Sequence, residues 1–133
     1  MPTKAMEVVR SFVDMVATKD FVGAAEHLDP DVVFLGTRGG LDEARVLRGG
    51  TEWITYMREI EDPWRRWDIE TERLIDLGDT VVAFVREVGE PRHADLEVHN
   101  ETAVVFRVAR QKIVEARGYL DRDEALRVAR GTV

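Results

Sequence analysis

The chain has 133 residues, with 26 acidic residues against 19 lysines and arginines and a formal net charge of -7. A content of 44% hydrophobic and 34% charged residues is typical of a water-soluble globular protein, and the length predicts one domain over residues 1–133. The lack of cysteine excludes disulfides, thiolate catalysis and cysteine-ligated metal sites. The acidic balance argues against binding to a phosphate backbone, so we expect no nucleic-acid partner.

No targeting or membrane-spanning segment is predicted. Lys4, Glu7 and Arg10 interrupt the first turns of the chain, so no uncharged region of a signal peptide follows the start. The apolar runs at 81–85 and 103–106 are far shorter than the ~20 residues that a membrane-spanning helix needs. We therefore expect a cytoplasmic protein with no membrane partner.

The first half of the chain predicts helices. Apolar residues recur at the spacing of one helical face over residues 3–18, and a short second helix is expected over 21–28 with Asp20 as its N-cap. A third helix is expected to begin with Thr51 as its N-cap and to end before Pro63. These segments predict a helical layer near the N-terminus.

The remaining segments predict strands. The Asp-Pro-Asp sequence at 29–31 is expected to form a turn, because the residue before proline avoids helical geometry, and a short strand is expected at 32–35. Ile69, Thr71 and Ile75 are expected on one face of the next strand. The later strands are expected at 68–77, 80–88, 96–108 and 112–120, followed by a short helix capped by Asp121.

The order of these elements predicts an α+β fold. Helices come first and a meander of strands follows, which favours helices packed on one face of an antiparallel sheet. The turns that join the last strands are too short for the crossovers of parallel βαβ units.

The longest predicted strand indicates a cavity. Its even positions form an apolar row that should face the helices, but Asn100 and Thr102 interrupt that row. Buried polar groups need partners, so these two side chains either line a ligand cavity or are satisfied by nearby backbone or by solvent. Gly118 leaves space on the last strand that either a large helix residue or a ligand must fill. The expected walls of that space, unless they are ordinary core residues, are Phe34, Trp53, Tyr56 and Met57.

Two strands are apolar on both faces, in the segments 81–85 and 103–106. A sheet of such strands is covered on both faces. Because helices are expected on one face only, we predict a homodimer that forms through the other face of the sheet.

Arg86 and Glu87 are the candidate catalytic residues. Strand alternation turns one of them toward the helix-covered face, where a carboxylate would have a raised pKa and could act as a general base. An arginine there could hold an anionic or enolate oxygen. The alternative is a pair of charges that reach solvent near the end of the strand.

Acidic residues and a histidine alternate at the start of the longest strand, a spacing that could present metal ligands. A solvated end of a strand explains the same pattern, so we expect no metal and no cofactor. The residues concerned are Asp95, Glu97, His99 and Glu101.

Several short segments carry a resemblance to a known family. They are Arg48-Gly49, Leu77-Gly78-Asp79-Thr80-Val81-Val82, Val105-Phe106-Arg107-Val108 with Lys112-Ile113-Val114-Glu115, and the run from Tyr119 to Leu126. Their order resembles the SnoaL-like branch of the nuclear transport factor 2-like superfamily. The resemblance implies a cone-shaped, strongly curved antiparallel or mixed sheet wrapped around the N-terminal helices, an apolar pocket and frequent dimers. Polyketide cyclases, steroid isomerases, epoxide hydrolases and non-catalytic binding proteins share this fold, so fold does not determine activity.

The positions where this resemblance would place catalytic acids hold other residues. The steroid-isomerase base falls near Gly36, its oxyanion-side acid near Val104, and the acid of cyclases and epoxide hydrolases at Gly118. Glu87 is the acid that remains, in a weak match to the Arg-x-Asp pattern of the hydrolases. The sequence therefore favours a protein that binds a small apolar, ketone-like molecule, with cyclase or isomerase activity left open. The alternative is a non-catalytic homodimeric interaction module.

Overall fold

The computed structural model describes residues 2–131 as four helices and a six-stranded sheet. Within this range no helix has both the length and the apolarity needed to cross a bilayer. The elements are α1 (Lys4–Ala17), α2 (Phe21–Ala25), β1 (Leu28–Arg38), β2 (Val46–Arg48), α3 (Gly49–Glu61), β3 (Trp64–Asp76), β4 (Thr80–Pro91), β5 (Val98–Ala109), β6 (Lys112–Tyr119) and α4 (Arg122–Ala129).

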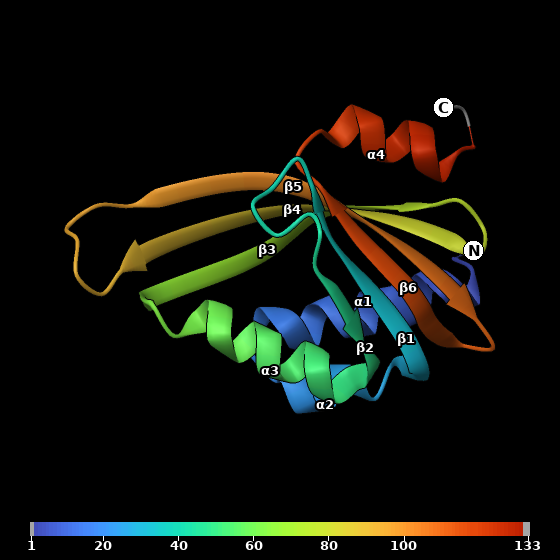
Figure 1. The fold of residues 1–133 in the computed structure, drawn as a ribbon. Coiled ribbons are helices and arrows are strands. Elements are labelled where there is room, and N and C mark those ends of the chain that lie inside the picture. The colour runs from blue at the N-terminus through green and yellow to red at the C-terminus, as the bar shows by residue number, and fades with distance from the viewer. Residues whose placement is uncertain (1, 132–133) are drawn as a thin grey trace.

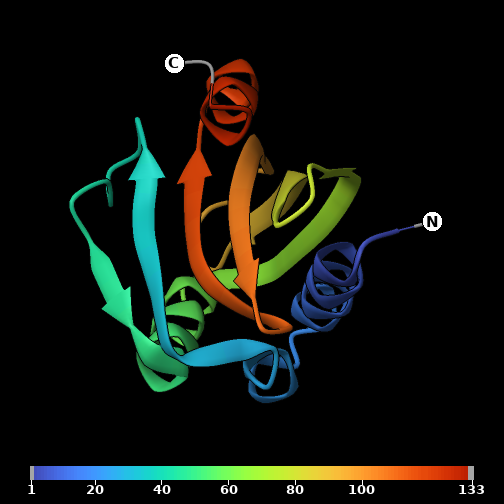
Figure 2. The same ribbon diagram turned by 90° about the vertical axis from the view of Figure 1, so that its right-hand side faces the viewer.

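The strands lie in the order β2-β1-β6-β5-β4-β3. The β1–β6 pair is parallel, and the other neighbouring strands are antiparallel. Figure 1 shows α1, α2 and α3 together on one side of the sheet and α4 on the other, and Figure 2 shows the strands bending around the N-terminal helices. The predicted α+β class and the curved mixed sheet are confirmed.

The first helix is held at its start by a side chain from the end of β3. The Thr3 hydroxyl accepts a 3.0 Å hydrogen bond from the Met6 amide, the arrangement of an N-cap. The Thr3 amide and hydroxyl both donate to the carboxylate of Asp76, each at 3.0 Å. These contacts set the position of α1 against the inner face of the sheet.

The core has two parts because the sheet is covered on both faces. The larger part lies between α1–α3 and the inner face and includes the fully buried Val9, Val32 and Ile113. The smaller part lies between the outer face and α4, where Val82 and Ala103 are fully buried. Burial of such apolar side chains is the main stabilising contribution to a fold of this kind.

The expectation that helices cover only one face was wrong. The terminal helix packs over part of the outer face, against Tyr119 and Val105 among others. Because α4 already buries part of the apolar outer face, that face no longer requires a second copy of the chain to cover it. The homodimer stays a prediction.

The region around β1 differs from the expectation because pairing between strands overrides local signals. Residues 29–31 were expected as a turn but lie within β1, which pairs in parallel with β6 from Leu28 opposite Ile113 onward. A register shift between Leu28 and Val33 accommodates the Asp-Pro-Asp sequence. The short strand β2 was not expected; it forms because it pairs with β1.

The third helix begins earlier than expected. Arg48, not Thr51, is its N-cap, and the helix starts at Gly49 with no capping side-chain bond. Gly49 has a φ of 82°, a left-handed conformation that favours glycine. The Arg48 amide donates a 3.1 Å hydrogen bond to the Glu52 carboxylate, which satisfies one backbone donor at this end.

A register shift in β3 sends to opposite faces of the sheet residues that simple alternation predicts on one face. The shift falls between Thr71 and Arg73. Ile69 and Thr71 line the inner cavity described below, whereas Ile75 packs with the core under α4. One extra residue in a strand sends every later side chain to the opposite face, so strict alternation failed here.

Candidate functional site

A cavity of about 480 Å³ lies between the inner face of the sheet and the helices α1 and α3. This volume falls within the range of small-molecule sites. The apolar lining side chains include Phe12, Val13, Val16, Phe34, Leu47, Trp53, Met57, Ile60, Ile69, Val85, Val104, Phe106 and Ala116. The polar lining residues include Thr37, Asp42, Arg45, Tyr56, Thr71, Glu87, Asn100 and Thr102.

A cluster of aromatic rings joins the cavity to the core. The Trp53 ring stacks on Phe34 with centroids 5.6 Å apart and planes at 21°, and the Phe12 ring lies 5.1 Å from Trp53. Phe12 also meets Phe106 edge to face at 5.6 Å. Each such pair adds about 0.5–1.5 kcal/mol beyond its buried area, so these contacts stabilise the wall of the cavity. These rings are therefore both core residues and lining residues.

The structure brings together all seven residues predicted to bind substrate. Each of them lines the cavity: Phe34, Trp53, Tyr56, Met57, Asn100, Thr102 and Gly118. They come from β1, α3, β5 and β6, which meet because β1 pairs with β6 and α3 packs against β1. Contact with a ligand stays a prediction for every one of them.

The space beside Gly118 is not left entirely to a ligand. A Cβ atom built on Gly118 would lie 2.7 Å from the Thr37 hydroxyl oxygen. Thr37, at the end of β1, therefore occupies part of the volume that the sequence assigned to a ligand or a large helix residue. A larger residue at this position would require the Thr37 side chain to move.

Glu87 on β4 turns toward the cavity, as strand alternation allows. Asn100 lies directly opposite on β5, and its Nδ2 donates a 3.4 Å hydrogen bond to Glu87 Oε2. Burial raises the pKa of Glu87, while hydrogen bonds from Asn100 and Trp67 and the charge of Lys19 act in the opposite direction. Glu87 is therefore a carboxyl group whose proton is held more tightly than usual beside an apolar cavity.

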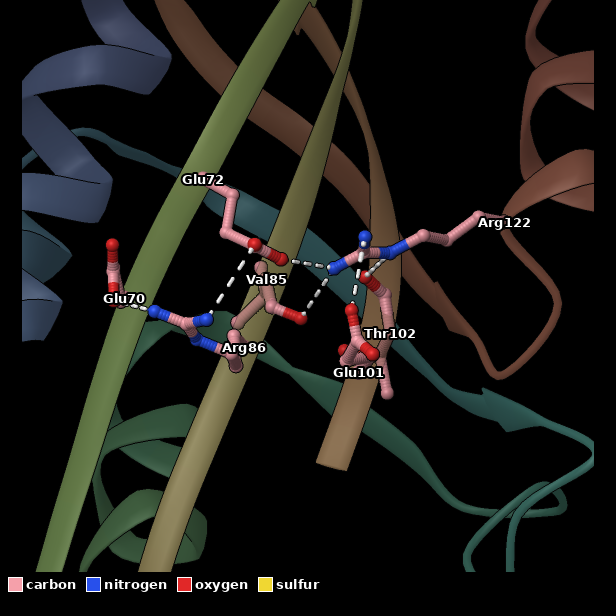
Figure 3. A network of polar contacts seen from close by, with 7 residues as sticks. All are labelled: Glu70, Glu72, Val85, Arg86, Glu101, Thr102 and Arg122. Carbon is pink, nitrogen blue, oxygen red and sulfur yellow. Dashed lines mark hydrogen bonds and ion pairs between the residues drawn. The ribbon is translucent and has the colours of Figure 1, made fainter. Parts of the chain in front are cut away.

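Arg86 lies on the opposite face of the same strand. Its Nη2 is 2.8 Å from Glu70 Oε2 and its Nη1 is 4.0 Å from Glu72 Oε2 (Figure 3). Arg86 does not line the cavity. The structure therefore separates the two catalytic candidates and leaves Glu87 as the one beside the cavity.

The outer face behind the cavity is held by Arg122, the first residue of α4 (Figure 3). Its guanidinium donates to the carbonyl oxygens of Val85 and Thr102, each at 3.1 Å, and pairs with Glu72 at 2.7 Å and Glu101 at 3.4 Å. Val85 and Thr102 face each other across β4 and β5, and their side chains line the cavity. Sequence reasoning missed this arginine because its partners are distant backbone groups.

A second polar pair in the cavity was also missed. The Tyr56 hydroxyl donates a 2.5 Å hydrogen bond to Asp42 Oδ2. Burial and the neighbouring Asp42 raise the pKa of Tyr56 well above its usual range, so the phenol stays protonated. Asp42 lies in the loop between β1 and β2, 14 residues from Tyr56, and no local pattern connects the two.

Gly36 explains how Asp42 reaches the cavity. A Cβ atom on Gly36 would lie 1.7 Å from the Asp42 carbonyl oxygen, and the Gly36 amide donates to Arg45 O at 2.8 Å. The loop therefore folds back directly over the last residues of β1. The family resemblance would place a catalytic acid near Gly36. The chain has no acid at that position, but the loop that packs against Gly36 brings the carboxylate of Asp42 to the cavity.

Three of the four residues considered as metal ligands at the start of the long strand, Glu97, His99 and Glu101, contact charged side chains instead. Glu97 contacts Arg66 at 3.1 Å and His99 at 2.6 Å, and Glu101 contacts Arg122. Over residues 2–131 no three His, Asp or Glu side chains are grouped closely enough to hold a metal ion. This region is the charged, exposed end of β5.

The chain was compared with protein-family models, curated proteins and solved structures. A family model described as a SnoaL-like domain matches residues 9–116. Comparison with curated proteins found no match.

Several solved structures share the fold. An NTF2-like protein from Burkholderia thailandensis is 23% identical, with a TM-score of 0.80, over 100% of this chain and 99% of that chain. An LEH-like epoxide hydrolase from M. tuberculosis is 20% identical, with a TM-score of 0.69, over 97% and 91%. A protein with a ketosteroid isomerase-like fold from Catenulispora acidiphila, solved with trimethylamine, is 11% identical, with a TM-score of 0.74, over 92% of each chain. At these identities the likeness shows the fold alone.

Proposed function

The chain belongs to the SnoaL-like domain family, and from this membership and the geometry of its cavity we propose that it binds a small, largely apolar molecule between α1, α3 and the inner face of the sheet. The observation that carries the proposal is the cavity of about 480 Å³, walled by aromatic and aliphatic side chains and provided with a few polar groups. Such a composition is typical of sites that bury an apolar ligand and orient it by a small number of hydrogen bonds.

The polar groups support this proposal because they form two separate points of orientation. One is Tyr56 with Asp42, and the other is Glu87 with Asn100. Asn100 is exposed, so the second pair lies where the cavity opens to solvent. A molecule with an apolar body and two polar groups fits this arrangement. The neighbour from Catenulispora acidiphila, solved with trimethylamine, is a protein of the same fold that holds a small organic molecule.

Ligand binding is tested by filling the cavity. Binding of 2-naphthol and related two-ring compounds is measured by thermal shift and calorimetry, since a ligand of the folded state alone raises the apparent Tm. Thr102→Phe places a ring in the cavity and should abolish binding, whereas Val98→Phe adds the same ring on the same strand outside the lining residues and should not. Equal binding by both variants, or no binding by the wild-type protein, would contradict the proposal.

A second candidate function is proton transfer, and the state of Glu87 favours it. A carboxylate with a raised pKa beside a bound enolisable ketone is suited to remove a proton from the carbon next to the carbonyl and to return it. Removal breaks a C–H bond, leaves the enolate and protonates Glu87; the reverse step restores the ketone. This chemistry is the first half of an isomerisation or a cyclisation.

The proton-transfer candidate is tested with 2-tetralone in deuterated water. Exchange of its α-protons, followed by NMR, should be accelerated by the wild-type protein and should fall by about 10²-fold or more in Glu87→Gln. Glu70→Gln removes a carboxylate paired with Arg86 on the outer face and should leave exchange unchanged. Exchange that persists in Glu87→Gln would exclude Glu87 as the base without affecting the binding proposal.

A further inference from the structure

The hydrogen-bonding direction of the Tyr56–Asp42 pair restricts what a ligand can present to it. A tyrosine hydroxyl has one proton, and a carboxylate has none. The 2.5 Å contact commits the Tyr56 proton to Asp42 Oδ2. The phenol oxygen and the other carboxylate lone pairs are therefore acceptors, and neither group has a proton left for a ligand.

The electrostatic surroundings keep the pair in this state. Burial, the hydrogen bond to Asp42 and the charges of Asp42 and Glu87 all oppose ionisation of Tyr56, which leaves the phenol protonated and the carboxylate as its acceptor. A short hydrogen bond to an ionised acceptor is among the stronger kinds in proteins. Tyr56 is therefore the donor of this bond and Asp42 the acceptor.

Arg45 is the cation that acts on this pair. Its guanidinium carbon lies 4.7 Å from the centroid of the Tyr56 ring, and its Nη2 is 3.6 Å from Glu59 Oε2 on α3. The guanidinium is thus held over the ring face and paired with a surface carboxylate. Its charge lowers the pKa of Tyr56, against the larger effects of burial and Asp42.

We propose that the Tyr56–Asp42 pair in the cavity is a subsite for a hydroxyl group, so that the protein selects an alcohol or a phenol and discriminates against a ketone or an ether at this position. This inference rests on the proposed ligand-binding function and names the chemical class of the ligand. A ketone or ether oxygen in contact with Tyr56 Oη and the Asp42 carboxylate would face two acceptors and would find no donor in the pair to replace its hydrogen bond to water. Sites that bind a donor group in this way reject analogues that lack it.

The subsite is tested by three probes that share one ring system. The dissociation constants of 2-naphthol, 2-methoxynaphthalene and 2-acetylnaphthalene are measured by calorimetry at neutral pH. We expect 2-naphthol to bind the wild-type protein about tenfold more tightly than either analogue, which corresponds to about 1.4 kcal/mol. This comparison needs no variant, so it does not depend on how a substitution affects folding.

A pair of variants tests whether Asp42 is the cause. Asp42→Asn supplies amide protons, so the pair can offer a donor, and the preference for 2-naphthol over 2-acetylnaphthalene should fall to about twofold or less. Glu43→Gln removes a charge from the neighbouring residue, which does not line the cavity, and should keep the tenfold preference. Equal affinities of the wild-type protein for the three probes, or a preference unchanged in Asp42→Asn, would overturn the hydroxyl subsite and leave the cavity as a binding site. Failure of all three probes to bind would contradict the ligand-binding function itself, and the subsite with it.

Discussion

Arg122 and Thr102 meet across the thickness of the sheet. Arg122 Nε donates a 3.1 Å hydrogen bond to the Thr102 carbonyl oxygen from the side of α4, while the Thr102 side chain lines the cavity on the inner side. The same guanidinium stacks over the Phe84 ring at 4.7 Å. The terminal helix is thereby attached to the strands that form one wall of the cavity.

Replacement of Arg122 should therefore loosen this wall. Arg122→Met keeps an apolar stem over Phe84 but removes the bonds to the carbonyl oxygens of Val85 and Thr102, and we expect a loss of about 2 kcal/mol in the free energy of unfolding. Arg107→Met is the control, because its 3.4 Å pair with Glu115 is exposed and should contribute less than about 1 kcal/mol. Denaturant titration of both variants measures the difference. An equal effect of the two would mean that Arg122 adds nothing beyond an ordinary surface pair.

Asp76 should stabilise the protein in a pH-dependent way. Hydrogen bonds from the amide and hydroxyl of Thr3 and from the amide of Gly78 lower the pKa of its carboxyl group. Because the folded-state pKa lies below the unfolded one, the stabilisation is present at neutral pH and is lost as the pH falls through the folded-state pKa. Asp76→Asn should lower the Tm by about 3–6 °C at neutral pH, and the difference in Tm between the wild-type protein and this variant should become smaller in acid.

The control for Asp76 is Asp79→Asn, in the same turn. Its amide substitution changes the charge by the same amount but removes none of the hydrogen bonds to Thr3. If Asp79→Asn lowers the Tm as much as Asp76→Asn does, the effect comes from net charge. The same conclusion follows if the difference in Tm between the wild-type protein and Asp76→Asn does not change with pH.

The contribution of Glu87 to stability should have the opposite pH dependence from that of Asp76. Burial raises the pKa of Glu87, so between the unfolded and folded pKa values the folded state binds more protons and stability falls as the pH rises. Glu87→Gln cannot ionise, so it should be more stable than the wild-type protein at neutral pH and equal to it below the ordinary pKa of glutamate. Thermal unfolding across a pH series measures this difference. A variant that is less stable at neutral pH would show that the hydrogen bonds of the carboxylate outweigh the effect of burial.

Gly36 should tolerate no side chain. Gly36→Ala would place a Cβ atom 1.7 Å from the Asp42 carbonyl oxygen and displace the loop that carries Asp42. We expect a loss of about 2 kcal/mol, together with a weaker preference for 2-naphthol over its analogues. In the control Gly50→Ala, the new Cβ would lie 3.5 Å from that of Ala25, an ordinary contact in the first turn of α3, and stability should stay the same or rise. If Gly36→Ala is as stable as Gly50→Ala, the loop does not depend on this close approach.

Several features of the site could be read from the sequence because they follow from local periodicity. Alternation along β5 placed Asn100 and Thr102 on the inner face, and helical spacing placed Trp53 and Tyr56 on one side of α3. Adjacent positions on a strand point to opposite faces, so the sequence also predicted that only one of Arg86 and Glu87 would turn inward. The turn at Gly78, the last two strands and the cap at Asp121 also follow from short-range signals.

The sequence alone therefore specifies the order of the longer helices and strands, the α+β class and the apolar inner face of the sheet. Only the tertiary structure decided which acids reach the cavity and what holds its walls. Asp42 meets Tyr56 because a loop folds back over Gly36, and Arg122 reaches Val85 and Thr102 because α4 crosses the outer face. These contacts join residues with no common period, so they depend on how the strands pair and where the loop closes. The cavity is therefore lined by two carboxylates: Glu87, which strand alternation allowed, and Asp42, which only the folded loop supplies.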